Sequence, residues 1–281
     1  MISFIERSSL PASAEAVPLF SSRGPRAASR WLDILIALST ADLRVRYGRG
    51  GFRLVKWLID PFLLVGVYLV LVTLVLDRPG EAPGLSVACA VIPFQLVLLS
   101  AFSAIASVHG RQNIILNMGF NRMLIPVASV VTETIAFGAG FLLLVMMLAI
   151  YSIGPTVALF WLPVVLLVCI AFAVSLAYPI SLFGIWLPQL RSLAGSVIRT
   201  LFFLSPGLVA LAEIHGRTHD LLKLNPLTGL FEAFRSIFLY GHRPAAWQLL
   251  YPSLFAVIAL ILFVPIYRRE EPQFAKIVEM E

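Results

Sequence analysis

The sequence predicts an all-α integral membrane protein that crosses the bilayer about six times. Of its 281 residues, 59% are hydrophobic and only 13% are charged, whereas a soluble domain carries roughly 25% charged residues. The stretch from Thr134 to Leu190 contains no charged side chain. As one helix it would far exceed a hydrocarbon core of about 30 Å. The chain must therefore fold back inside this stretch.

Five segments are long and apolar enough to span, and in hydrocarbon each must be helical because unpaired backbone groups are costly there. They cover about 58–76, 85–107, 127–150, 158–180 and 246–267. The run Ser152-Ile153-Gly154-Pro155 separates the third from the fourth. A sixth span at 194–212 is weaker, because Arg199 interrupts it and Ser205-Pro206-Gly207 breaks its far end. The long Arg199 side chain can extend to the headgroups.

The distribution of Lys and Arg orients the chain with both termini in the cytoplasm. Six spans place 16 of these residues inside and 5 outside, which is a strong positive-inside bias. Dropping the fifth span gives 17 inside and 4 outside, which fits equally well. The charge pattern therefore fixes the N-terminus and leaves the number of spans open.

The chain before the first span divides into two parts. Residues 1–29 predict a disordered cytoplasmic tail, and 30–56 predict an amphipathic helix in the inner interface. The apolar stripe of that helix comprises Trp31, Ile34, Leu38, Ala41 and Val45. An ordinary juxtamembrane helix is the alternative. Either one explains the pI of about 9.7 without nucleic acid as a partner. The six-helix domain then covers 57–267, and 268–281 form a second cytoplasmic tail.

The outer segment 213–245 is too apolar for a free loop and too short in its apolar runs to span. Leu224 to Phe231 and Ser236 to Tyr240 are these runs. Paired half-helices that enter from the outer face and return would fit, provided that protein buries them. A loop resting on the outer surface is the alternative.

The sequence contains no motif for nucleotide hydrolysis. A P-loop needs Gly-Lys followed by Ser or Thr, and none of the three lysines follows a glycine. We therefore predict no catalytic residue and no cofactor bound by this chain. His215 and His219 have metal-ligand spacing but lack a third placed ligand, so we predict no metal site.

Four residues are candidates for a substrate path through the membrane. Glu133 is a carboxylate well inside a predicted span, and such groups are functional candidates because burial is costly. Its alternative is structural, as a pair with Arg199 or Arg122 or as a bond within the bundle. The aromatic residues Trp186, Phe202 and Phe203 could stack on sugar rings, or could serve as packing or interfacial residues.

Three short motifs occur in a fixed order along the chain. They are Arg46-Tyr47-Gly48-Arg49-Gly50-Gly51-Phe52 with Trp57 and Pro61; Gln112-Asn113-Ile114-Ile115 with Phe120-Asn121-Arg122 and Pro126; and Phe202-Phe203-Leu204-Ser205-Pro206 with Asn225-Pro226-Leu227 and Arg235. In this order they resemble the permease subunits of type-2 ABC exporters, and within them the polysaccharide-export branch. The resemblance covers nearly the whole chain from about residue 30.

The resemblance implies six spans, a homodimer, an interfacial N-terminal helix and re-entrant half-helices before the last span. The re-entrant region would carry Asn225, Pro226 and Arg235. A separate ATPase subunit, which would hold ATP and Mg, would dock on a coupling loop and at a second contact. The coupling loop would present Arg111, Gln112, Asn113, Ile114, Ile115 and Arg122, and the second contact Gln189 and Arg191.

The implied function is export of a lipid-linked polysaccharide across the cytoplasmic (inner) membrane, as for O-antigen, capsule, teichoic acid or cell-wall galactan. Export of a drug or lipid is an alternative in the same class. A membrane glycosyltransferase or acyltransferase is the alternative in another class, and it would need a polar catalytic cluster. The chain departs from the family pattern at Pro188-Gln189-Leu190-Arg191, where Arg-Asp is usual, at Asn121-Arg122, which replaces Pro-Arg, and at Lys56. These departures bear on the contact with the ATPase.

Overall fold

The computed structural model describes residues 27–47, 52–75, 82–111, 121–187 and 204–274, together with residues 193, 196, 197, 199, 200 and 202. Throughout these residues the secondary structure is helical, with turns between helices and no strand. The prediction of an all-α protein is therefore confirmed.

Four of the described helices are long and apolar enough to cross a membrane. They are α3 (Pro83–Ile105), α5 (Leu124–Ile150), α6 (Leu162–Trp186) with the preceding 3-10 turn Val157–Trp161, and α10 (Ala246–Glu270). They coincide with four predicted spans, although α6 continues six residues beyond its predicted end. The chain is thus a multi-pass membrane protein. The predicted break between α5 and α6 is present, and Ser152 there has a positive φ of 55°.

The two remaining predicted spans are described in different degrees. Helix α2 (Phe52–Val70), with the π-helical turn Leu71–Val75, contains most of the predicted span 58–76 and begins earlier. The span 194–212 falls largely outside the described residues. The described residues from 193 to 202 are helical, and residues 204–209 form turns.

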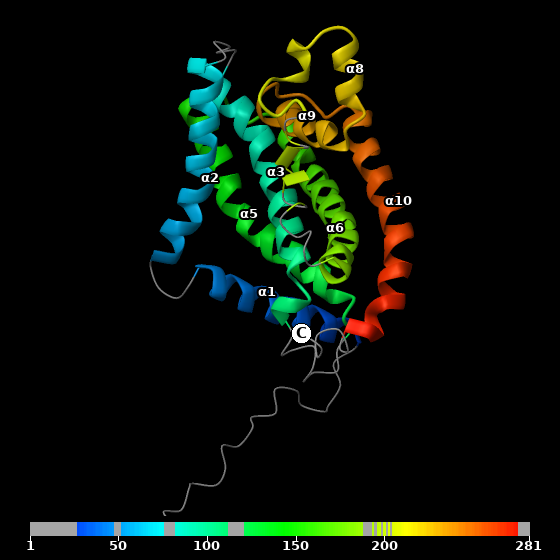
Figure 1. Ribbon diagram of the computed structural model, residues 1–281. Coiled ribbons are helices and arrows are strands. Elements are labelled where there is room, and N and C mark those ends of the chain that lie inside the picture. Colours follow the sequence, from blue (N-terminus) through cyan, green and yellow to red (C-terminus); the bar gives the residue numbers. More distant parts are fainter. Residues whose placement is uncertain are drawn as a thin grey trace, which may run out of the picture.

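Helix α3 is the central helix of the bundle. It contacts α5 and α6 along their lengths, and α2 and α9 as well (Figure 1). In its apolar window 72% of the residues are buried, against 17% for α10. A helix that is apolar all round needs an apolar environment on every side. Neighbouring helices supply it for α3, whereas α10 presents most of its apolar surface outward.

Short helices lie across both ends of the bundle (Figure 1). Helix α1 (Ala27–Tyr47) lies against α5 at one end, here called the α1 end. Helices α8 (Arg217–Lys223) and α9 (Pro226–Phe238) lie at the opposite end, here called the α9 end. Helix α10 packs beside α6 and runs from α9 to the α1 end.

The residues of the apolar stripe predicted for α1 face two different environments. Leu38 and Ile34 do pack on α5. Trp31, however, is 44% exposed and Val45 88% exposed. Ser39 is buried instead, and its hydroxyl donates to the carbonyl oxygen of Ala128 at 3.3 Å. The side of α1 that packs on the bundle therefore combines apolar residues with a serine that finds a hydrogen-bond partner there.

The outer segment 213–245 contains both an exposed and a buried helix. Helix α8 has no buried residue, whereas every residue of α9 from Leu227 to Phe238 is buried. The side-chain amide oxygen of Asn225 caps α9 by accepting the Leu227 N–H at 3.0 Å. Because Pro226 follows as the first helical residue, its missing N–H costs nothing there. Asn225 and Pro226 thus set the residue at which α9 begins, and burial of its side chains holds the helix in place.

Candidate functional site

The structure separates the predicted site residues into two polar clusters, one at each end of the bundle. Arg111 and Arg122 lie at the α1 end, and Asn225, Pro226 and Arg235 lie at the α9 end. Seven of the predicted residues lie outside the residues that the structure describes: Gln112, Asn113, Ile114, Ile115, Gln189, Arg191 and Phe203.

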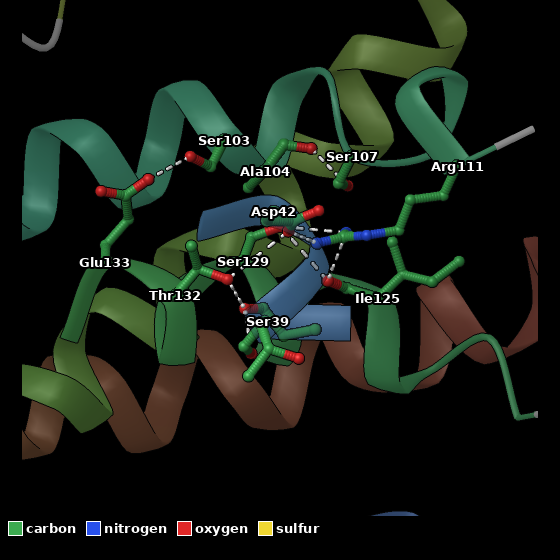
Figure 2. A network of polar contacts seen from close by, with 12 residues as sticks. Ser39, Asp42, Ser103, Ala104, Ser107, Arg111, Ile125, Ser129, Thr132 and Glu133 are labelled. Atoms are coloured by element: carbon green, nitrogen blue, oxygen red, sulfur yellow. Dashed lines mark hydrogen bonds and ion pairs between the residues drawn. The ribbon is translucent and has the colours of Figure 1, made fainter. Parts of the chain in front are cut away.

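Arg111 marks the first root of the predicted coupling loop, and its side chain points into the bundle (Figure 2). The side chain is only 6% exposed and forms an ion pair with Asp42 of α1. Its Nη1 donates to the carbonyl oxygen of Ile125 and to the hydroxyl of Ser129, both at 3.2 Å. A buried guanidinium needs such partners, because an uncompensated buried charge is very unfavourable.

Asp42 connects the same contact to α5. Its Oδ2 also accepts from the hydroxyl of Thr132, at 3.4 Å. The ion pair therefore joins α1, the loop root and α5 in one network. The sequence had singled out Arg111 and missed Asp42. The available signal was a carboxylate on a helix that also carries an apolar stripe.

Arg122 marks the second root of the predicted coupling loop, just before α5. Its backbone N–H donates to Oε1 of Glu271 at 2.8 Å, and its Nη1 donates to the main-chain carbonyl of Glu271 at 3.0 Å. The neighbouring Asn121 accepts the Met123 N–H through its side chain at 2.9 Å. Asn121 thus caps the chain that leads into α5, at the position where the family pattern has proline.

Glu133 lies in the third turn of α5 inside the bundle, where it is 2% exposed. The hydroxyl of Ser103 donates to its Oε1 (Figure 2). A bond within the bundle is therefore present, and the guanidinium of Arg122 is engaged at Glu271. Arg199 lies 5.4 Å from the ring centroid of Phe102. A part for Glu133 in a substrate path stays a prediction.

Of the three aromatic residues predicted to share a path, the two that the structure describes, Trp186 and Phe202, lie apart. Phe202 is buried against Phe94, with ring centroids 4.7 Å apart, and against Tyr68 and Phe231. Trp186 ends α6 and is 46% exposed. It lies near Gly184, which packs on Ile105 at the far end of α3 from Phe94. The eleven residue steps from Phe94 to Ile105 span roughly 16 Å at about 1.5 Å per residue.

The pieces of the third sequence motif, Ser205-Pro206, Asn225-Pro226 and Arg235, meet at the α9 end. Asn225 donates from Nδ2 to the hydroxyl oxygen of Ser205 at 2.7 Å. Arg235 donates from Nη1 to the carbonyl oxygen of Pro206 at 2.7 Å, and from Nη2 to that of Gly207 at 3.0 Å. The turn at residues 205–207 is thereby fastened to both ends of α9.

Glu232 completes this cluster, and the sequence had not indicated it. One of its oxygens accepts from Arg235 at 2.7 Å and from the N–H of Leu211 at 3.0 Å. Arg235 also donates from Nε to the carbonyl oxygen of Ser86 in the first turn of α3, at 3.3 Å. Arg235 is fully buried. Buried charges require this degree of compensation, so the cluster is a structural lock between α3, α9 and the turn.

In the described part of the chain no three His, Cys, Asp or Glu side chains are grouped to hold a metal ion. His219 instead contacts the adjacent Asp220, with Nδ1 and Oδ1 3.2 Å apart.

The fold and the two clusters define a multi-pass α-helical membrane protein whose polar contacts fasten loops to both ends of a helix bundle. No protein-family model matches the chain. It is 25% identical over 247 residues to the O-antigen export system permease protein RfbA of Myxococcus xanthus, covering 86% of this chain and 94% of the relative. Two proteins of the same name from Klebsiella pneumoniae are 23% and 22% identical, each over 248 residues and 95% of the relative. The resemblance to export permeases of the O-antigen branch is thereby confirmed.

Proposed function

We propose that this chain is the transmembrane subunit of an ATP-driven exporter that moves a lipid-linked polysaccharide across the cytoplasmic membrane. The observation that carries the proposal is the end-to-end similarity to permeases named for O-antigen export, which extends over at least 94% of each relative. The convergence of Ser205-Pro206, Asn225-Pro226 and Arg235 at one contact supports it. These residues belong to the third sequence motif on which the resemblance depends.

In this proposal the α1 end faces the cytoplasm. The positive-inside bias of the sequence supports this orientation. A partner ATPase, carrying ATP and Mg, docks on the loop between Arg111 and Arg122 and makes a second contact near Gln189 and Arg191. The two loop roots are each hydrogen-bonded to the bundle. A displacement of the loop by the ATPase would therefore also displace α1 and α5.

We further propose six spans, with α2 as the first and the segment around 194–212 as the fifth. Helix α1 lies in the inner interface, and α9 with α8 forms the re-entrant region before α10. The complete burial of α9 among other helices supports this placement, since polar backbone ends at membrane depth are tolerated only where protein covers them. Two copies of the chain form the transport unit.

The substrate path is proposed to include Trp186, Phe202, Phe203 and Glu133. Trp186 is accessible in a single copy, whereas Phe202 and Glu133 are buried within it. The glycan would thus meet Phe202 and Glu133 only after ATP binding separates helices that are packed together in this structure. Aromatic faces then offer stacking surfaces for sugar rings.

Reconstitution tests the function directly. The chain is co-expressed with a P-loop ATPase subunit, purified as a complex and placed in proteoliposomes that contain a lipid-linked polysaccharide. We expect ATP-dependent transfer of the polysaccharide across the bilayer, abolished when the P-loop lysine of the partner is replaced. Transport of a small drug or a lipid without the glycan would favour the alternative substrate. Turnover of a lipid-linked donor by the isolated chain would instead identify an enzyme.

Cysteine labelling tests the topology. The native Cys89 and Cys169 are buried, so background labelling is low. R217C and K223C should react with an impermeant thiol reagent in intact cells, because six spans place α8 outside. Reaction only after lysis would support five spans.

A further inference from the structure

The C-terminal end of α10 is joined to the second root of the coupling loop. The sequence had assigned residues 268–281 to a cytoplasmic tail without a role. In the structure α10 continues to Glu270 and is followed by a 3-10 turn, Glu271–Gln273, and then by Phe274. Residues 271–274 are called the C-terminal clasp below.

The clasp is anchored by aromatic packing. Phe274 is fully buried, and its ring centroid lies 5.1 Å from that of Tyr267 in an edge-to-face arrangement. Tyr267 packs in the same way on Tyr178 of α6, at 5.2 Å. Such pairs stabilise a contact beyond the area that they bury. The clasp is therefore a packed element of the α1 end.

The clasp and the loop root are joined by two reciprocal hydrogen bonds. The Glu271 carboxylate accepts the backbone N–H of Arg122 at 2.8 Å. In return the Arg122 guanidinium donates to the main-chain carbonyl of Glu271 at 3.0 Å. Each side chain thus binds the main chain of the other residue, so that removing one side chain leaves the other bond in place.

The carboxylate is also placed where the electrostatics favour it. Arg122 immediately precedes the first turn of α5, whose N-terminal amides form the positive end of the helix dipole. The side-chain oxygen of Asn121 accepts the Met123 N–H there, and the hydroxyl of Tyr178 donates to the Met123 carbonyl oxygen at 3.2 Å. Glu271 supplies the acceptor for the one amide between Asn121 and Met123, from 149 residues further along the chain.

We propose that Glu271 is a positioning residue for the coupling loop, and that the C-terminal clasp fixes the α5 root of this loop in the orientation that the partner ATPase engages. This inference rests on the proposed function. Each root of the loop is then held by a different helix region: Asp42 of α1 holds Arg111, and Glu271 after α10 holds Arg122. A loop held only at Arg111 would pivot when pushed and would move α5 less.

The test compares E271A with E271Q, R122A and the control E270A. Glu270 adjoins Glu271 and has the same charge. Amide hydrogen exchange on the purified full chain comes first. Exchange of the Arg122 amide should rise by about tenfold in E271A, the scale of one lost charge-assisted hydrogen bond. It should rise less in E271Q, whose amide oxygen still accepts, and stay unchanged in E270A. R122A keeps the carboxylate bond and should leave that amide protected.

The second measurement uses the complex with the ATPase in proteoliposomes. E271A should lower the amount of polysaccharide moved per ATP hydrolysed while the yield of the complex stays the same, and E271Q should restore most of the ratio. A merely structural role would lower yield and turnover together. If E271A gives no folded protein, E271Q provides a weaker form of the comparison, in which exchange of the Arg122 amide should still exceed that in E270A.

The outcomes separate the inference from the function on which it rests. Unchanged exchange at Arg122 in E271A would overturn the clasp. Faster exchange combined with the transport ratio of E270A would overturn the positioning role. If wild-type chain supports no ATP-dependent transport with any P-loop partner, the proposed function fails. The exchange data then still decide whether the clasp holds the loop root.

Discussion

Arg235 of α9 donates a hydrogen bond of 2.7 Å to the carbonyl oxygen of Pro206, 29 residues earlier in the chain. The same guanidinium reaches Gly207 and Ser86 and pairs with Glu232. The Ser-Pro turn, the Asn-Pro start of α9 and the arginine are therefore parts of one contact. The turn and α9 are joined closely enough that they should move together.

Replacing Arg235 by alanine should strongly destabilise the protein. The change leaves the buried Glu232 carboxylate without its cation, and breaking one partner of a buried pair costs about 3–5 kcal/mol. We expect a large drop in the thermal unfolding midpoint of the purified chain. R243A, at an exposed arginine of the following loop, should change stability by less than about 0.5 kcal/mol. Equal shifts in the two variants would contradict the lock.

Two variants should distinguish the cap of α9 from the contact to the turn. N225A removes both the acceptor for Leu227 N–H and the donor to Ser205, whereas S205A removes only the second. We expect N225A to cost about 1 kcal/mol more than S205A, the usual value of an N-cap. Hydrogen exchange should accelerate in the first turn of α9 in N225A alone. Faster hydrogen exchange in the first turn of α9 in S205A would show that the contact with the turn, and not the Asn225 cap, stabilises the start of the helix.

Removing Asp42 should loosen the docking of α1 on the bundle. D42A leaves the buried Arg111 without its anion. A cysteine placed at the buried Ser39 reports the change. The labelling of S39C by a permeant maleimide should rise about tenfold for each 1.4 kcal/mol lost from docking. D33A, at an exposed carboxylate of the same helix, should leave the rate unchanged. If D33A and D42A raise it equally, the effect is one of net charge.

Gly184 and Gly66 should respond in opposite directions to alanine. A Cβ at Gly184 would lie 2.1 Å from the carbonyl oxygen of Ile105, so α6 and α3 would have to separate. Close helix approach at small residues is a main source of stability within membranes. G184A should therefore lower the unfolding midpoint. Among the residues that the structure describes, a Cβ at Gly66 would meet no atom within 4 Å outside its own helix backbone, and G66A should stabilise by about 0.5–1 kcal/mol. A loss of stability in G66A would indicate a neighbour supplied by a second copy of the chain.

The spans that were best predicted owe their clarity to the membrane itself. A long uncharged run in hydrocarbon must form membrane-spanning helices, and the helix-breaking residues Ser152 to Pro155 indicated where the chain turns back. The boundary of α6 was missed by six residues because Gly184 packs on Ile105 at the end of α3 and Ser181 contacts Ser107 in the turn after it, at 3.2 Å between hydroxyl oxygens. Hydropathy cannot show that contact. The orientation of α1 on the bundle was likewise hidden, since it depends on partners for Ser39 and Asp42 in other parts of the chain.

The sequence by itself determined that this chain is a multi-pass helical protein and which relatives it resembles, because apolar length and short ordered motifs are local properties. The tertiary structure alone decided what the charged residues do. Arg111 faces inward to Asp42, 69 residues away, and Arg122 meets Glu271 across 149 residues. Such pairings compensate polar and charged groups that lose water when the helices pack. The choice of partner depends on which helix ends meet in space, and no local pattern in the sequence records that.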